Sequence, residues 1–206
     1  MDQNLLTFSL SVFTGFFAIM NPIANTPIFL GLTEGHDQKT KKVIAKQATI
    51  TAFIIVASFV ILGKYIFEVF GITIPAFKIT GGILIFYVGF EMLLSQKSKI
   101  HGSREVQTDD SIAISPLAIP ILAGPGTIVT AMNNVTDANY LHIAIVIAIF
   151  GLMAYLTYLA FSLSDYIVKE IGTHLITVIG KLMGLILAII GTGMVVEGIK
   201  LAFGLE

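Results

Sequence analysis

The sequence predicts an all-α membrane protein of six transmembrane helices, arranged as two inverted three-helix repeats with helices 1 and 4 broken at mid-span. The first observation behind this fold class is composition: of the 206 residues, 55% are hydrophobic and only 12% are charged, and the mean hydropathy is +0.90. A soluble domain carries about 25% charged residues, so this chain lacks the charged shell of a water-soluble core. The other two observations are long uncharged stretches and two interruptions that contain proline.

The uncharged stretches divide the chain into six spans. A spanning helix needs about 20 predominantly apolar residues, and six of them with their connections use nearly the whole chain. The predicted spans are, in order, residues 3–33, 43–67, 72–94, 111–134, 142–163 and 174–202. Residues 95–110 are the only extended polar stretch and are predicted to be a cytoplasmic linker. Residues 1–94 then form the first three-helix repeat, and residues 111–206 form the second.

The distribution of lysine and arginine predicts how these spans are oriented. Loops on the cytoplasmic side are enriched in both residues. With the N-terminus outside, nine of the 12 basic residues fall inside, and only Lys64, Lys78 and Lys200 remain outside. An even number of spans then places both termini on the outer side. The first apolar stretch is longer than a signal-peptide core, so we expect it to be retained as a span.

The two halves correspond when the chain is shifted by 103 residues, which aligns Pro22 with Pro125 and Lys78 with Lys181. The number of identical pairs is close to what so apolar a composition gives by chance. The placement of the matches is the better indication, because the proline of span 1, the acidic residue that ends it and the Lys-x-x-Gly of span 3 all find counterparts without a gap. Each half has an odd number of spans, so the halves are upside-down relative to each other, as in the inverted repeats of secondary transporters.

Two polar stretches, Asn21–Pro27 and Gly124–Thr127, interrupt spans 1 and 4 at corresponding depths. Proline removes a backbone donor, clashes with the carbonyl four residues earlier and disfavours helical geometry in the residue before it. We therefore expect both stretches to unwind for a few residues. The alternative is that these prolines only shape helix packing.

Unwinding would create a site with both signs of partial charge. It frees N–H groups that attract an anion and C=O groups that suit a cation. The side chains of Asn21, Asn25, Thr26 and Thr127 could add hydrogen bonds. Two facing breaks would thus bind a small zwitterion.

The chain resembles the MarC family (UPF0056) of bacterial and archaeal inner-membrane proteins, which includes SnatA-type neutral amino acid transporters. Two motifs carry the resemblance, Asn-Pro-Ile-x-x-x-Pro at residues 21–27 and Gly-Pro-Gly-Thr-Ile at residues 124–128, and it extends over essentially the whole chain. It implies a 3+3 inverted repeat with spans 1 and 4 broken, location in the cell inner (plasma) membrane with periplasmic termini, and transport of glycine, alanine or a similar amino acid, with sodium or protons as candidate coupling ions. The implied substrate-binding residues are Asn21, Pro22, Ala24, Asn25, Thr26, Pro27, Gly124, Pro125, Gly126 and Thr127.

Several function classes find no support in the sequence. The absence of cysteine excludes thiolate metal sites and cysteine catalysis, and the four histidines show no metal-ligand spacing. No catalytic constellation appears, so we expect neither an enzyme nor a resident cofactor or metal. No ionisable residue lies at the centre of a predicted span, so a proton relay is not indicated. The net charge of −1 does not suggest a nucleic-acid partner.

Two further interpretations stay open. A passive channel for small neutral solutes is the alternative to a transporter, because matched half-helices also occur in pores, and a homo-oligomer is compatible with either. Five glycines are expected to let spans 3 and 6 approach closely, because small residues allow membrane helices to pack at short distance. They are Gly81, Gly82, Gly184, Gly191 and Gly193.

Overall fold

The computed structural model describes residues 5–94, 113–135 and 139–205, and every regular element in these ranges is helical. In chain order the elements are α1 (Leu5–Met20), α2 (Thr26–Leu32), α3 (Gln38–Phe70), α4 (Ile74–Leu94), the π-helix η1 (Ala113–Leu122), α6 (Pro125–Asn133), α7 (Tyr140–Ser162), α8 (Ser164–Ile171) and α9 (Thr173–Phe203). The predicted linker, residues 95–110, lies outside the described residues.

Four of the described helices are long and apolar enough to cross a membrane. They are the Gln38–Gly63 part of α3, together with α4, α7 and α9, while α1 is a shorter apolar helix. The all-helical class and an apolar helix of spanning length at the second, third, fifth and sixth predicted spans are therefore confirmed. The stretches predicted as spans 1 and 4 each hold two shorter helices, α1 with α2 and η1 with α6.

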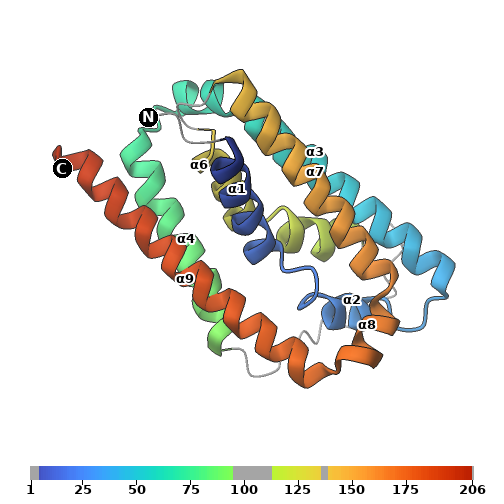
Figure 1. Ribbon diagram of the computed structural model, residues 1–206. Coiled ribbons are helices and arrows are strands. Elements are labelled where there is room, and N and C mark those ends of the chain that lie inside the picture. The colour runs from blue at the N-terminus through green and yellow to red at the C-terminus, as the bar shows by residue number, and fades with distance from the viewer. Residues whose placement is uncertain (1–4, 95–112, 136–138, 206) are drawn as a thin grey trace.

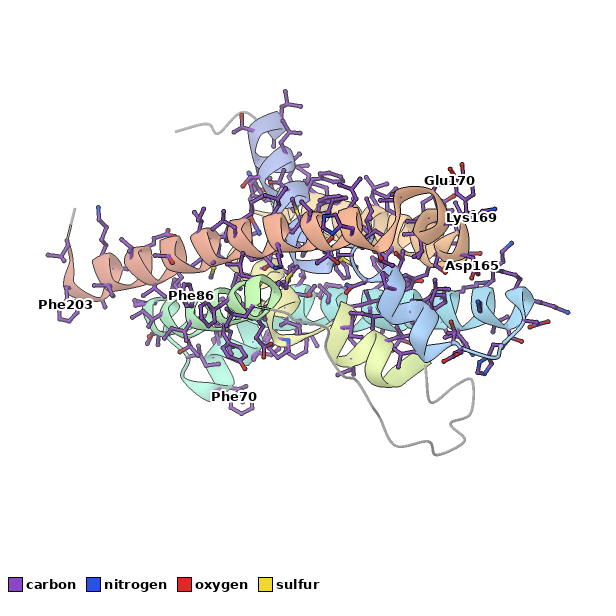
Figure 2. All side chains as sticks on the ribbon, turned by 90° about the horizontal axis from the view of Figure 1, so that it is seen from below. Phe70, Phe86, Asp165, Lys169, Glu170 and Phe203 are labelled. Carbon is purple, nitrogen blue, oxygen red and sulfur yellow. The ribbon has the colours of Figure 1, made fainter. Side chains whose placement is uncertain are left out.

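The long helices form two pairs, with the short elements between them. In Figure 1, α4 and α9 lie side by side, as do α3 and α7, and α1, η1 and α6 occupy the space between the pairs. α2 and α8 pack together at one end of the molecule, opposite the start of α1 and the end of α9. Figure 2 shows the same two ends by their side chains, with Phe70 and Phe203 at one and Asp165 and Lys169 at the other.

Local sequence signals explain where the long helices begin and end. The Asp37 side chain accepts a hydrogen bond from the Thr40 N–H at 2.9 Å and caps the start of α3. Gly71 ends α3 with a φ of 62°, a left-handed conformation that glycine adopts without steric cost. The Asn139 side chain caps α7 by accepting from the His142 N–H at 3.0 Å.

Glycines set the separation of α4 and α9. A Cβ atom built on Gly191 would lie 2.4 Å from the backbone nitrogen of Phe86 and 2.5 Å from the carbonyl oxygen of Gly82. A Cβ atom built on Gly184 would lie 2.8 Å from the carbonyl oxygen of Gly89. The predicted close approach of these two helices is therefore confirmed for Gly82, Gly184 and Gly191, and Gly89 is a further member.

The other two glycines do not serve this contact, so their prediction is wrong. A Cβ atom on Gly81 would meet the Val129 side chain of α6 at 2.4 Å, and one on Gly193 would have no neighbour within 4 Å. The sequence shows which helix a glycine belongs to, but only the packing of the helices decides which neighbour that glycine contacts.

Ion pairs join the halves at opposite ends of the described part of the molecule. The Lys41 ammonium of α3 lies 3.2 Å from the carboxylate of Asp165 in α8, and Gln38 also donates to that carboxylate. At the other end, Lys78 of α4 pairs with Glu197 of α9. The sequence predicts that Lys78 lies on the outer side of the membrane, and the structure pairs it with a carboxylate.

Candidate functional site

The chain between α1 and α2 makes a tight turn at Asn21. The Asn21 N–H continues the last turn of α1 by donating to the Phe17 carbonyl at 2.9 Å. Asn21 itself has a φ of 35°, in the left-handed region that asparagine enters more readily than other non-glycine residues. A hydrogen bond from the Asn25 N–H to the Asn21 carbonyl, at 3.1 Å, closes the turn.

Two of the polar side chains predicted to face a ligand stabilise this turn instead. The Asn25 side-chain amide donates to the Met20 carbonyl at 2.7 Å, and the Thr26 hydroxyl donates to the Ile23 carbonyl at 2.7 Å. The Asn25 bond satisfies the Met20 carbonyl, which lies at the end of α1, and the Thr26 hydroxyl adds a second bond to the Ile23 carbonyl, which also accepts from the Thr26 N–H at 3.2 Å. These two donors are therefore occupied by the protein.

Asn21 differs from its neighbours in the turn. Its side-chain oxygen accepts from the Ala24 N–H at 3.3 Å, but its amide nitrogen has no hydrogen-bond partner within the described part of the chain. The residue is 1% exposed. A buried donor without a partner costs about 1–3 kcal/mol, so this amide is poised to bind an acceptor supplied from outside the chain.

The second interruption is shorter than the first. The last turn of η1 closes with an i→i+5 bond, from the Ala123 N–H to the Ala118 carbonyl at 2.8 Å. Gly124 is extended, with φ −70° and ψ 169°, and α6 starts at Pro125. Only residues 123 and 124 thus lie outside helices, whereas the sequence predicted unwinding through Thr127.

The reason is that proline fits the first turn of a helix. Its missing N–H is not needed there and its fixed φ is already helical. Pro125, Gly126 and Thr127 therefore form the first turn of α6, as Thr26 and Pro27 form the first turn of α2. Thr127 is buried in this turn, with 1% of its surface exposed.

The end of α1 and the start of α6 lie against each other. A Cβ atom on Gly126 would lie 2.6 Å from Cδ1 of Ile19, and one on Gly15 would lie 3.4 Å from Cγ2 of Thr130. These contacts run in opposite directions along the two helices. The carbonyl end of α1 and the N–H end of α6 are therefore brought to one place.

The ten predicted residues do not all share this environment. Ala24, Asn25 and Pro27 are partly exposed, and Pro125 is exposed. A hollow of about 500 Å³ lies elsewhere, between α3 and α7, and none of the ten lines it. The buried ones are Asn21, Pro22, Thr26, Gly124, Gly126 and Thr127.

No metal centre is indicated in the described ranges, where no three His, Cys, Asp or Glu residues lie close enough to hold an ion. The site thus consists of helix ends, the buried polar side chains of Asn21 and Thr127, and the apolar residues packed around them.

Four long apolar helices paired around shorter helices define a multi-pass integral membrane protein embedded in a lipid bilayer. The model of the MarC family integral membrane proteins matches residues 6–203, so the chain belongs to the MarC (UPF0056) family.

Similar proteins occur in bacteria and archaea. UPF0056 membrane protein YvbG of Bacillus subtilis is 39% identical, over 95% of this chain and 96% of its own length. UPF0056 membrane protein PYRAB13050 of Pyrococcus abyssi is 36% identical over the whole of both chains. A UPF0056 membrane protein of Aquifex aeolicus is 35% identical, over 91% of this chain and 90% of its own. No solved structure matches the chain.

Proposed function

We propose that this protein is a secondary transporter of small neutral amino acids such as glycine or alanine, and that the substrate binds, without being chemically changed, where α1 ends and α6 begins. The observation that carries the proposal is a buried amide nitrogen with unused hydrogen-bonding capacity. The Asn21 amide nitrogen lacks a partner among the described residues, and Thr127 is buried in the first turn of α6. They belong to segments that the Ile19–Gly126 contact holds together.

The chemistry of this junction suits a zwitterion. The N–H end of α6 favours a carboxylate, and the carbonyl end of α1 favours an ammonium group. The Asn21 amide would donate to the carboxylate, while the Thr127 hydroxyl can donate or accept. The junction also favours a small substrate, because Ile19 fills the space beside Gly126, where even a methyl group would be 2.6 Å from its Cδ1 atom.

An inverted repeat is part of the proposal. The elements follow the same order in the two halves, with two short helices and then two long ones, apart from the added α8. Packing between the halves is reciprocal, because α1 packs on α7 while η1, its counterpart, packs on α3. Such an arrangement supports a substrate site at the interface of two repeats that rock against each other.

Sodium is the coupling ion to test first, with protons second. Backbone carbonyls at helix ends can coordinate a cation without a carboxylate. The ion pairs of Lys41 with Asp165 and of Lys78 with Glu197 join α3 to α8 and α4 to α9, and neither includes a residue of the α1–α6 junction.

Reconstitution into liposomes tests the transport function. Saturable counterflow of labelled glycine or alanine, together with a thermal shift by the same amino acids with or without sodium, is the expected result. Flux that rises linearly with concentration and shows no counterflow would instead identify a passive channel. If no amino acid shifts the thermal midpoint or is transported, the substrate class is wrong.

Isosteric substitution tests the site. Thr127→Val removes only a buried hydroxyl and keeps the shape of the side chain, so we expect a folded protein with about a tenfold loss of affinity, which corresponds to about 1.4 kcal/mol. Thr157→Val is the matched control, because Thr157 is buried and its hydroxyl bonds to the Met153 carbonyl within α7. Asn21→Gly keeps the left-handed turn and removes the amide, and it should also weaken binding. Wild-type affinity in both site variants would refute the location of the site.

A further inference from the structure

A groove of about 500 Å³ runs along the junction of α3 and α7, which lie side by side in Figure 1. Its volume falls within the range of about 300–1,000 Å³ typical of small-molecule sites. The groove is open on one side, because Ile50 of α3 is 47% exposed and Tyr155 of α7 is 57% exposed. Both helices are candidate membrane spans, so this open side faces lipid.

The floor of the groove is apolar. Gly151 lacks a side chain at the point where a Cβ atom would come within 3.3 Å of the Phe53 ring, and this absence helps to create the hollow. The Thr49 hydroxyl donates to the Ala45 carbonyl of its own helix at 2.9 Å, so its polar group is already satisfied. The floor therefore favours an alkyl chain.

One end of the groove carries a positive charge. Lys46 lines it and is exposed, and no carboxylate pairs with it in the described ranges. The uncharged residues 47–63 follow directly and extend for about 25 Å, close to the thickness of the hydrocarbon layer. Lys46 therefore lies at the level of the lipid headgroups, at the end of the molecule where α3 meets α8. Tyr158 lines the same end, and tyrosine is enriched at this depth.

We propose that this groove binds one anionic phospholipid, with its phosphate at the Lys46 ammonium and an acyl chain against the floor between Phe53 and Gly151. Charge complementarity selects this occupant, because an unpaired cation at headgroup depth attracts anionic lipid. The groove extends for about 10 Å from Lys46 to Phe53, which suits the upper part of an acyl chain. A symmetric dimer through this face would bring two Lys46 side chains to the same depth and is disfavoured by their repulsion.

Matched lipids and matched variants test the proposal on the full-length protein in detergent. Native mass spectrometry would compare dioleoyl-phosphatidylglycerol with dioleoyl-phosphatidylcholine, which have identical acyl chains. We expect tighter binding of phosphatidylglycerol. Lys46→Gln should weaken that binding about fivefold, the factor that corresponds to about 1 kcal/mol per basic residue at the membrane surface. Lys42→Gln is the control, because Lys42 is exposed on α3 but does not line the groove.

The apolar half of the site needs its own variant. Ile50→Trp fills the groove from an exposed position and should also weaken phosphatidylglycerol binding, whereas Ile54→Trp, which is 58% exposed and outside the groove, should not. Equal binding of the two lipids would overturn the proposal, as would equal losses in Lys46→Gln and Lys42→Gln. If phosphatidylglycerol bound more weakly to Lys46→Gln but as tightly as before to Ile50→Trp, the lipid would lie on the helix surface rather than in the groove. That result would also overturn the proposal.

Discussion

Replacing Gly191 by alanine is the most direct test of how the two halves are held together. The added methyl group would lie 2.4 Å from the Phe86 nitrogen and 2.5 Å from the Gly82 carbonyl oxygen. Both neighbours are backbone atoms of α4, so no side chain can rotate away. Ordinary contact starts at 3.4 Å, and α4 and α9 must therefore separate by about 1 Å at this point. Overpacking of this kind costs about 1–3 kcal/mol.

Gly193→Ala is the matched control, two residues along the same helix. A Cβ atom there would meet nothing within 4 Å. Both variants gain the same helix propensity, about 1 kcal/mol for glycine to alanine, so the difference between them isolates the cost of the contact. For a chain of this size, that cost corresponds to a thermal midpoint about 2–12 °C lower in Gly191→Ala than in Gly193→Ala.

The assay is thermal unfolding of the purified protein in a mild detergent, followed by loss of the monodisperse size-exclusion peak. Equal midpoints for the two variants would refute the reasoning, because a methyl group cannot occupy the Gly191 position unless α4 and α9 lie farther apart than the structure has them. A lower midpoint in Gly193→Ala alone would show that the other face of α9 is packed.

Two further predictions concern stability. Phe29 is 0% exposed, and its ring stacks on that of Phe161 with 4.6 Å between the ring centroids, so Phe29→Ala should destabilise the protein by about 3–5 kcal/mol. Phe203→Ala is the control, because Phe203 is exposed and its replacement should leave the stability unchanged. Equal thermal midpoints for the two variants would contradict the packing role of Phe29. Hydrogen bonds from the side chain and backbone N–H of Thr40 lower the pKa of Asp37 below its ordinary value of 3.8. The ionised Asp37 therefore stabilises the folded state above pH 3.8, and this stabilisation is lost as the pH falls through the lowered pKa of the folded state. Asp37→Asn keeps a capping oxygen, so its thermal midpoint should lack this acid-dependent decrease, and parallel pH profiles for the two proteins would contradict the assignment.

The class of fold was predictable because it depends on composition and on the length of apolar runs. Four of the predicted spans coincide with apolar helices of spanning length, since a run of about 20 apolar residues has few alternatives to a helix in lipid. The stretches Asn21–Pro27 and Gly124–Thr127 both include points where helices end or begin in the structure. Proline and glycine act on their own backbone, so their effect is local and can be recognised in the sequence.

The details of the candidate site were less predictable. Asn25 and Thr26 were expected to offer hydrogen bonds to a ligand, but they donate to the carbonyls of Met20 and Ile23. Asn21, from the same list, keeps an amide nitrogen without a described partner. Residue type shows which groups can form hydrogen bonds, whereas the path of the turn decides which of them are used within the protein.

The short helix α8 shows a similar limit. Its eight residues mix apolar and charged side chains, and the sequence was interpreted as a connection between two spans. The structure places it against α2, with Asp165 paired to Lys41. A helix this short is marginal by itself and is stabilised by the surface on which it packs, which no local pattern reveals.

The sequence by itself determined that the chain is embedded in a membrane, that it is helical, and that proline and glycine stand where helices end near residues 21–27 and 124–127. These properties follow from the cost of burying charge and backbone in lipid and from the local geometry of proline. Only the tertiary structure decided that Ile19 meets Gly126, that Gly191 rather than Gly193 faces α4, and that Lys46 borders an apolar groove. Each of these is a contact between residues distant along the chain, and its geometry depends on how whole helices pack rather than on the residues adjacent in sequence.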